Sequence, residues 1–201
     1  MAEDVKVILA SSSATRRDLL TRAGLRFEVV TPGVDEEEAK ASLRSRRATG
    51  GATAEALAEL KARKVSGSHP GVLVIGADQL LVCGTLWFSK PETVEKARDQ
   101  LLTLRGKTHE LFTSVCVARD GVRLWHHTDT AHLTMRNFSE DFLDDYLRQM
   151  GSTVLQSVGA YQAEGLGIQL FSRILGDYFG IMGLPVLPLL DFLRTHMAVA
   201  R

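Results

Sequence analysis

Residues 110–134 read ELFTSVCVARDGVRLWHHTDTAHLT and carry the clearest topological signal in the chain. Two runs of strand-forming residues, 110–118 and 122–134, flank the dipeptide Asp120-Gly121, which is typical of the tight turn of a β-hairpin. A hairpin joins antiparallel strands, so the sheet that contains these residues is not purely parallel.

The sequence upstream of this hairpin alternates strands with helices. Residues 5–10 form an apolar run of strand length, three serines follow, and 14–23 are expected to form a helix with Ser13 as its N-cap and Gly24 as its stop. The strand over 72–75 is expected to end at Gly76-Ala77-Asp78. Other strands are predicted over 27–30, 80–83 and 86–88, and other helices over 53–65 (N-cap Thr53), 93–104, 139–150 and 187–198, while 35–47 are a helix or a mobile lid. Helices early and a long hairpin in the middle predict an α/β fold with a mixed sheet flanked by helices.

The composition describes a globular domain without a global electrostatic field. The 201 residues are 45% apolar and carry 24 basic and 24 acidic side chains, which suits one large domain or two tightly joined lobes over 1–201. The charge balance argues against nucleic acid and anionic membrane as partners. No apolar run reaches the ~20 residues of a membrane helix, and 1–6 do not resemble a signal peptide. Cys83 and Cys116 are expected to be buried thiols, so we expect a cytoplasmic protein.

Polar clusters follow several of the predicted strands, where α/β proteins tend to bind ligands. The first comprises Ser11, Ser13, Thr15, Arg16 and Arg17, and its hydroxyls, helix N-terminus and arginines favour an anion. The alternative is a serine-rich turn with solvated arginines. The second is the acidic run 35–38, whose carboxylates suit Mg²⁺ or Mn²⁺ but also suit a solvated helix face.

Three more clusters complete the candidate site. Asp78, next to Gln79, is costly to bury unless it is paired or bound to a metal. Lys90 and Lys61 are expected to converge on an anion, unless they are ordinary surface lysines. The glycine-rich segment 159–167, which includes Glu164, permits close approach to a flat ligand. The segment 106–108 imitates the end of a P-loop, but it follows a helix and is interpreted as a turn.

Together these clusters resemble the Maf family of nucleotide pyrophosphatases over nearly the whole chain. The matching segments are 9–13, 16–20, 34–36, 57–62, 76–79, 90–91, 159–161, 164–167 and 183–185. The resemblance implies an extended mixed sheet, two lobes and a central cleft. It also implies hydrolysis of a nucleoside triphosphate to the monophosphate and pyrophosphate with a divalent cation, Mg²⁺ or Mn²⁺. The family is often dimeric, which leaves a homodimer open.

The resemblance also implies roles for individual residues. Asp78 corresponds to the proposed proton acceptor, and Glu36, Lys61, Lys90 and Arg16 correspond to residues around the phosphates and the metal. Glu36 and Asp78 are the expected metal ligands. The expected substrate-binding residues are Ser11, Ser13, Thr15, Arg17, Gln79 and Glu164. Two assignments stay open: Asp78 is the base, or Asp78 is chiefly a metal ligand and Glu36 is the base.

Three positions bear on the nucleobase. The family's dTTP- and UTP-preferring branch usually has arginine, threonine and glutamine where this chain has Thr15, Gln79 and Glu164. The branch that prefers 7-methyl-GTP typically has tryptophan, glutamine and glutamate there. Two positions therefore match the 7-methyl-GTP branch, and Thr15 matches neither. A carboxylate at Glu164 suits guanine because it accepts hydrogen bonds from N1 and N2.

Two functions compete at this point. The first is hydrolysis of a non-standard or modified nucleotide, in the service of nucleotide-pool cleaning. The alternative is a nucleotide-binding regulator of cell division and septum formation whose catalysis is vestigial. The full set of Glu36, Lys61, Asp78 and Lys90 favours the enzyme.

Overall fold

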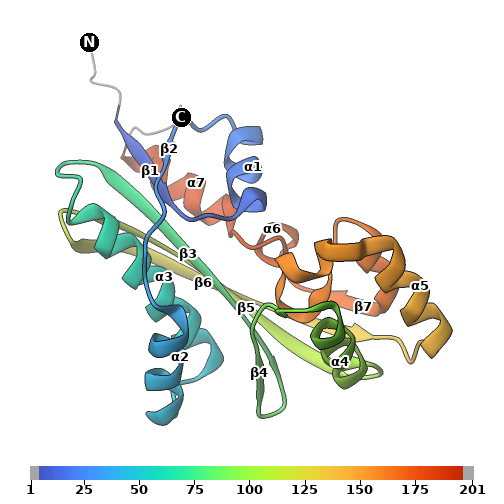
Figure 1. The fold of residues 1–201 in the computed structure, drawn as a ribbon. Coiled ribbons are helices and arrows are strands. Elements are labelled where there is room, and N and C mark those ends of the chain that lie inside the picture. Colours follow the sequence, from blue (N-terminus) through green and yellow to red (C-terminus); the bar gives the residue numbers. More distant parts are fainter. Residues whose placement is uncertain (1–4, 197–201) are drawn as a thin grey trace.

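The structure is a computed structural model that describes residues 5–196. Within this range one mixed sheet of seven strands runs in the order β2-β1-β3-β5-β6-β7, with β4 paired to β3 (Figure 1). The strands are β1 (Val7–Ala10), β2 (Glu28–Val29), β3 (Leu73–Cys83), β4 (Leu86–Phe88), β5 (Thr108–Arg119), β6 (Val122–Met135) and β7 (Phe171–Leu175). β1 is parallel to β2 and β3, and the other pairs are antiparallel. The predicted mixed α/β sheet is confirmed.

Seven α-helices and three short 3-10 helices surround this sheet in the described chain. They are α1 (Ala14–Arg22), α2 (Glu36–Ser45), α3 (Gly50–Ser66), α4 (Val94–Leu104), α5 (Glu140–Met150), α6 (Tyr178–Ile181), α7 (Val186–Thr195), η1 (Gly151–Gln156), η2 (Val158–Ala160) and η3 (Leu166–Leu170). Side chains cap most of the α-helices: Ser13, Asp35, Thr49, Thr93, Ser139 and Asp177 accept first-turn amides. No helix between residues 5 and 196 is long and apolar enough to cross a membrane.

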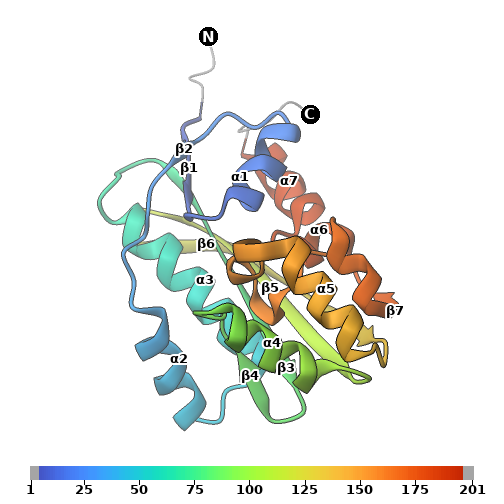
Figure 2. The ribbon, with the colours of Figure 1, turned by 45° about the vertical axis from the view of Figure 1, so that its right-hand side comes forward.

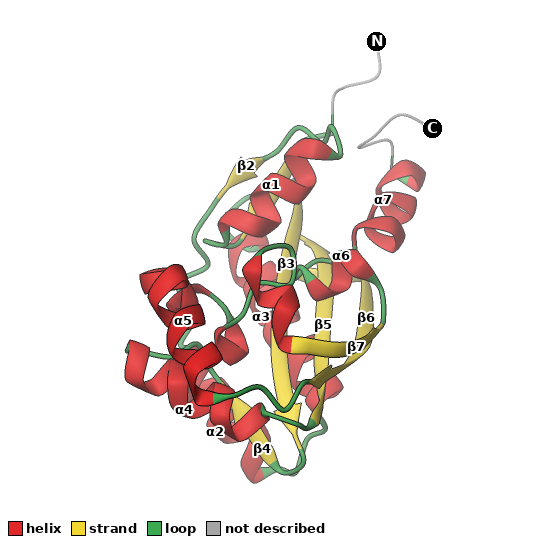
Figure 3. Ribbon diagram, turned by 90° about the vertical axis from the view of Figure 1, so that its right-hand side faces the viewer, coloured by secondary structure: helices red, strands yellow, loops and turns green. Residues whose placement is uncertain are grey.

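Two hydrophobic clusters lie at opposite ends of the long strands. Leu73, Ile75 and Ala77 of β3 pack with α1 and α7, whereas Leu81 and Cys83 of the same strand pack with α4 and α5. Figures 1 and 2 show α1 with α7 at one end of the strands and α4 with α5 at the other, and Figure 3 shows the same division from the side. Because β3, β5 and β6 run through both clusters, the two lobes share one continuous sheet.

A polar row separates these two clusters on one face of the sheet. Gln79 of β3 pairs in register with Thr113 of β5, and Thr113 pairs with Asp129 of β6. Directly paired residues point to the same face, so the three side chains form a line across the sheet. Gly180 of α6 lies against this row, since a Cβ there would meet Asp129 Oδ2 at 2.9 Å. The row marks where the apolar interior stops and a ligand cleft can begin.

The opposite face of β3 is covered by α3, which approaches unusually closely. A Cβ added to Gly76 would overlap the carbonyl oxygen of Ala58 and would lie 2.6 Å from the amide nitrogen of Ala62. Only glycine allows this separation, and the alanines of α3 supply the complementary small surface. Since side chains alternate along a strand, Asp78 lies on this α3 face, while Gln79 lies on the other.

Two predictions about these elements were wrong, and several short elements had not been predicted. The strand begun at 72 does not end at 76–78: β3 continues without interruption to Cys83, because Gly76 serves packing and not a turn. Helix α3 begins earlier than expected and is capped by Thr49, while Thr53 is buried and donates to the Thr49 carbonyl. The unpredicted elements are helix α6, strand β7 and the 3-10 helices of 151–170.

The remaining elements follow the predictions closely. Asp120 and Gly121 have φ values of 51° and 76°, the left-handed backbone of the expected hairpin turn. Residues 35–47 form mainly α2, the helical alternative of the two that were open. Both cysteines are buried and free, and 106–108 lie where α4 passes into β5. The last helix is confirmed to Thr195, and its expected end near 198 lies outside the described residues.

Candidate active site

The cleft opens where one edge of β3 has no neighbouring strand. β1 pairs with residues 73–76 and β4 pairs with residues 81–83 of the same edge, so residues 77–80 have a free edge between them. A cleft of about 730 Å³ lies there, which is within the range of small-ligand pockets. Asp78 and Gln79, which point to opposite faces of β3, both line this cleft.

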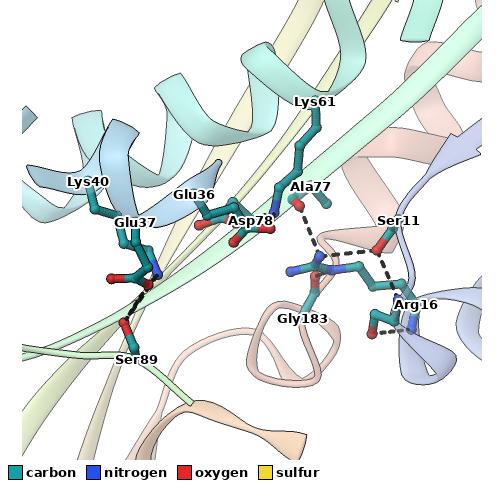
Figure 4. Close-up of polar contacts among 11 residues, drawn as sticks. Ser11, Arg16, Glu36, Glu37, Lys40, Lys61, Ala77, Asp78, Ser89 and Gly183 are labelled. Atoms are coloured by element: carbon teal, nitrogen blue, oxygen red, sulfur yellow. Dashed lines mark hydrogen bonds and ion pairs between the residues drawn. The ribbon is translucent and has the colours of Figure 1, made fainter. Parts of the chain in front are cut away.

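Arg16 fixes one wall of the cleft by taking part of the free strand edge. Its Nη1 donates to the Ala77 carbonyl at 2.9 Å and to Ser11 Oγ at 3.4 Å, and its Nε donates to the Gly183 carbonyl at 2.8 Å (Figure 4). Burial lowers the pKa of Arg16, opposed by Asp78 and Glu36, which raise it. A guanidinium stays protonated at neutral pH all the same. Arg16 is therefore an oriented, permanent positive charge.

The centre of the cleft is a buried lysine between two carboxylates. Lys61 Nζ of α3 lies 2.5 Å from Asp78 Oδ1 and 2.8 Å from Glu36 Oε1 of α2. Asp78 is 3% exposed and Lys61 5%, so the pair is shielded from solvent screening. The second oxygen of Asp78, Oδ2, is also buried and has no hydrogen-bond partner among residues 5–196. A buried acceptor is normally paired, so Oδ2 has a hydrogen bond still to make.

The charges around this centre shift one another's pKa values. Partial burial raises the pKa of Glu36, but Lys61, with Lys40 and Arg16, outweighs this effect and holds the pKa below its usual range. Desolvation lowers the pKa of Lys90, and the positive charges of Arg16 and Lys61 lower it further, against Glu36 and Asp78. Glu36 is thus a persistent carboxylate, and Lys90 gives up its proton more easily than an ordinary lysine does.

Lys40 lines the cleft but is not among the site residues predicted from the sequence. Its Nζ lies 3.0 Å from Glu37 Oε1 and 3.3 Å from Ser89 Oγ, and Ser89 donates to the same carboxylate oxygen at 3.0 Å. Figure 4 shows Lys40, Glu37 and Ser89 on the opposite side of Asp78 from Arg16. The sequence does contain a signal for Lys40: it follows Glu36 by four residues, so both side chains lie on one face of the helix.

Gln79 is held with its amide nitrogen turned away from a ligand. Nε2 donates to Thr113 Oγ1 at 2.9 Å and to the carbonyls of Ile181 and Gly180 at 3.1 and 3.2 Å. Reversing the amide would set its oxygen against two carbonyl oxygens, so this orientation is fixed. The Gln79 oxygen is then the atom left to accept a hydrogen bond.

A loop of the lobe that contains α4 and α5 forms the far wall of the cleft. Glu164 is exposed and lines the cleft together with Ser157 and Gln162. The loop turns tightly, since a Cβ at Gly167 would meet the Gln162 carbonyl oxygen at 2.5 Å. Below it, the hydroxyl of buried Tyr161 shares a 2.9 Å hydrogen bond with His109 Nε2, and burial lowers the pKa of His109 to about 4. The neutral imidazole makes this a structural support and not an acid–base group of the cleft.

The structure brings together most of the residues selected from the sequence. Those lining the cleft are Ser11, Ser13, Thr15, Arg16, Glu36, Lys61, Asp78, Gln79, Lys90 and Glu164. Arg17 is not among the lining residues: its side chain is 55% exposed and its Nε lies 3.8 Å from Asp18 Oδ1. Helix α1 directs Arg16 and Arg17 apart, since neighbouring helical residues face different directions.

Two carboxylates of the cleft, Glu36 and Asp78, are the groups that could hold a hard divalent cation. Residues 5–196 contain no group of three or more His, Cys, Asp or Glu side chains arranged to hold a metal. Glu36 and Asp78 nevertheless lie close together, since both contact Lys61 Nζ, and Asp78 Oδ2 has no partner within the described chain. Mg²⁺ is commonly bound by one or two carboxylates, with water and substrate phosphates completing its coordination. Two carboxylates therefore suffice for a cation that arrives with a phosphate ligand.

A mixed α/β sheet with a cleft at its open edge, lined by one arginine and three lysines, defines an α/β protein suited to a polyanionic ligand. The chain belongs to the Maf-like protein family, whose model matches residues 6–196. It is 53% identical over 195 residues to a nucleoside triphosphate pyrophosphatase of Granulibacter bethesdensis, covering 97% of this chain and 99% of the relative. It is 56% identical over 189 residues to the protein of that name from Paramagnetospirillum magneticum (94% and 97%). It is also 48% identical over 195 residues to a 7-methyl-GTP pyrophosphatase of Brucella abortus (97% and 98%).

Proposed function

We propose that this protein is a nucleoside triphosphate pyrophosphatase that hydrolyses its substrate to the nucleoside monophosphate and pyrophosphate. The observation that carries the proposal is Lys61 held between Asp78 and Glu36 in a cleft whose walls bear Arg16 and Lys90. Cations on both sides of a carboxylate pair suit a triphosphate, because negative charge grows on the leaving pyrophosphate. The relatives named above are similar in sequence to this chain over nearly its full length.

Each residue has a task in this reaction. Arg16, locked by three hydrogen bonds, and Lys90 bind phosphate oxygens and stabilise the charge of the departing pyrophosphate. Asp78 accepts a hydrogen bond from the attacking water at Oδ2 and orients it towards the α-phosphorus. Lys61 fixes the Asp78 carboxylate through Oδ1, which leaves Oδ2 for the water and for a bound cation.

Glu36 and Asp78 would also hold Mg²⁺ or Mn²⁺. The bound cation supplies neutralisation of phosphate charge. In this scheme Glu36 remains an ionised ligand, in keeping with its lowered pKa, and Asp78 is the group nearest the water.

For the base, we propose a guanine-type substrate such as 7-methyl-GTP. Gln79 offers an acceptor oxygen, because its nitrogen is occupied, and Glu164 offers a carboxylate. Guanine presents N1 and N2 donors to such acceptors, whereas uracil and thymine present a single N–H. The name of the Brucella relative agrees with this choice. A cytoplasmic role in clearing modified nucleotides would suit such a substrate, and no feature of the described cleft favours the regulatory alternative.

The test is pyrophosphate release from a nucleotide panel with Mg²⁺ or Mn²⁺. The panel holds the common NTPs and dNTPs, 7-methyl-GTP and other modified bases, with Asp78→Asn as the inactive control. We expect release of pyrophosphate with preference for guanine-type bases. Release from pyrimidines alone would refute the base assignment, and no release from any nucleotide would refute the enzyme.

A further inference from the structure

Helix α2 is attached to the rest of the protein by polar contacts. None of its ten residues is buried. Its contacts come from positions four residues apart: Glu36 reaches Lys61, Lys40 reaches Ser89, and Arg44 donates to the Thr85 carbonyl at 3.4 Å and lies over the Trp87 ring. A helix normally docks through an apolar stripe at this spacing. Here the stripe is charged, and two of its members line the cleft.

The Lys40–Glu37 pair is unequal in its access to solvent. The side chain of Lys40 is only 14% exposed, whereas that of Glu37 is 74% exposed. Lys40 therefore stays in the cleft wall, and Glu37 reaches it from the solvent side. An exposed carboxylate gains little from such a pair, so an anion that enters the cleft can displace Glu37 without leaving a buried charge unpaired.

The position of Lys40 indicates which part of a nucleotide would lie near it. Gln79 and Asp78 point to opposite faces of β3 at its free edge, so a ligand whose base contacts Gln79 crosses that edge to reach Asp78. Glu36 meets Asp78 at Lys61, and Lys40 lies one helical turn farther along α2. The group beyond the reacting phosphate is therefore the one that approaches Lys40.

From these contacts, and resting on the proposed function, we propose that Lys40 is a binding residue for the distal phosphates of the substrate, which replace Glu37 as its partner. Ser89, which accepts from Lys40, directly precedes Lys90 in the chain. Lys40 and Lys90 together would bind the pyrophosphate portion, with Glu37 displaced into solvent. Glu37 then competes with the substrate, while Lys40 favours it.

Opposite effects of two neighbouring substitutions test this proposal. We expect Lys40→Met to weaken the binding of inorganic pyrophosphate with Mg²⁺ by about tenfold or more, as for loss of a charge-assisted contact. We expect Glu37→Gln to tighten it by about twofold to threefold, because the competing charge is removed. Binding of GMP, which lacks the distal phosphates, should be unchanged in both variants. Calorimetric titration measures all three.

Arg44→Met is the matched control, since it loosens α2 without touching the cleft lining. Its pyrophosphate affinity should equal that of the wild type. If Lys40 only anchors the helix, Arg44→Met will reproduce the loss in Lys40→Met, and Glu37→Gln will weaken binding as well; either result overturns the proposal. Thermal melting of each variant separates unfolding from lost binding. A wild-type protein that releases no pyrophosphate from any nucleotide would instead overturn the proposed function.

Discussion

At the scale of single residues, the centre of the cleft consists of one lysine shared by two carboxylates. Lys61 satisfies Asp78 and Glu36 at once, which leaves Asp78 Oδ2 free within the described chain. Replacing Lys61 would leave two carboxylates, one of them buried, without their shared partner. Function and local stability are therefore tied to the same side chains.

Asp78→Asn tests the water-orienting role. The amide keeps the size of the side chain but supplies a donor where an acceptor is needed, so we expect kcat to fall by about 100-fold or more. The KM should change little, because Arg16 and Lys90 still bind the phosphates. Steady-state pyrophosphate release measures both constants. A kcat within about twofold of the wild type would remove Asp78 from the reaction.

We expect deprotonation of Lys90 to set the alkaline limb of the pH profile of kcat/KM. The pKa of Lys90 is lowered by desolvation and then by Arg16, so the free protein loses this positive charge at a lower pH than an ordinary lysine would. Activity that needs the charge is complete below that pKa and declines as the pH rises through it. Since arginine stays protonated, Lys90→Arg should extend the plateau of kcat/KM to higher pH. An identical alkaline limb in the variant would show that another group controls it.

At the scale of elements, the site residues of β3 were predictable from the sequence, but the length of the strand was not. The residues of the site around Asp78 were identified from their chemistry, yet the strand was expected to stop there. A glycine shortly before a polar pair resembles a turn, whereas the contacts that require Gly76 come from Ala58 and Ala62 of α3. The residues that neighbour Gly76 in the sequence do not include that helix. The local sequence therefore suggested a turn where the structure has a packing contact.

Gly76→Ala tests the close packing of β3 on α3. The new Cβ would overlap the Ala58 carbonyl oxygen and would lie 2.6 Å from the Ala62 amide nitrogen. Both are backbone atoms that cannot turn aside, so we expect a loss of about 2–4 kcal/mol in the free energy of unfolding. Gly67→Ala is the control, since its nearest contact is at 3.5 Å and it should be close to neutral. Urea denaturation compares the two.

The polar row explains why base recognition was only partly predictable. Gln79 was selected from the sequence, but its orientation depends on Thr113 and on the carbonyls of α6, a helix that was not predicted. Those carbonyls lie 101 and 102 residues away along the chain, and such contacts leave no local pattern. The identity of a site residue can thus be found from its type and neighbours, while the atom that it presents to a ligand cannot.

Thr113→Val tests this orientation. Valine keeps the shape of threonine but removes the Oγ1 acceptor, so the Gln79 amide loses one of its three anchors. We expect the preference for guanine-type over pyrimidine nucleotides to fall by about threefold to tenfold, with little change in kcat for the best substrate. The ratio of kcat/KM values for the two nucleotides is the measurement. An unchanged ratio would show that the Gly180 and Ile181 carbonyls suffice.

At the scale of the whole molecule, two hydrophobic clusters share one sheet, and the cleft lies between them. The mixed sheet, the long hairpin and most helices were predictable because each has a local periodicity or cap. The small elements of 151–181 were not, since they are short and take their shape from the lobe that they cover.

Removal of metal should separate activity from folding. Lys61 already pairs with both Asp78 and Glu36, so we expect the fold not to depend on a metal in the way that a zinc finger does. We expect EDTA to abolish pyrophosphate release and to shift the melting temperature by less than about 2 °C. Added Mg²⁺ should restore activity. A large fall in melting temperature on chelation would indicate a structural metal.

The free edge of β3 has a consequence for inhibitor design. Asp78 and Gln79 are adjacent in the chain but face opposite sides of the sheet, and both line the cleft. A flat, rigid compound can occupy one side only. An effective inhibitor would need a flexible joint where a nucleotide has its sugar, with a planar donor-bearing group on one arm and a compact, hydrolysis-resistant polyanion on the other.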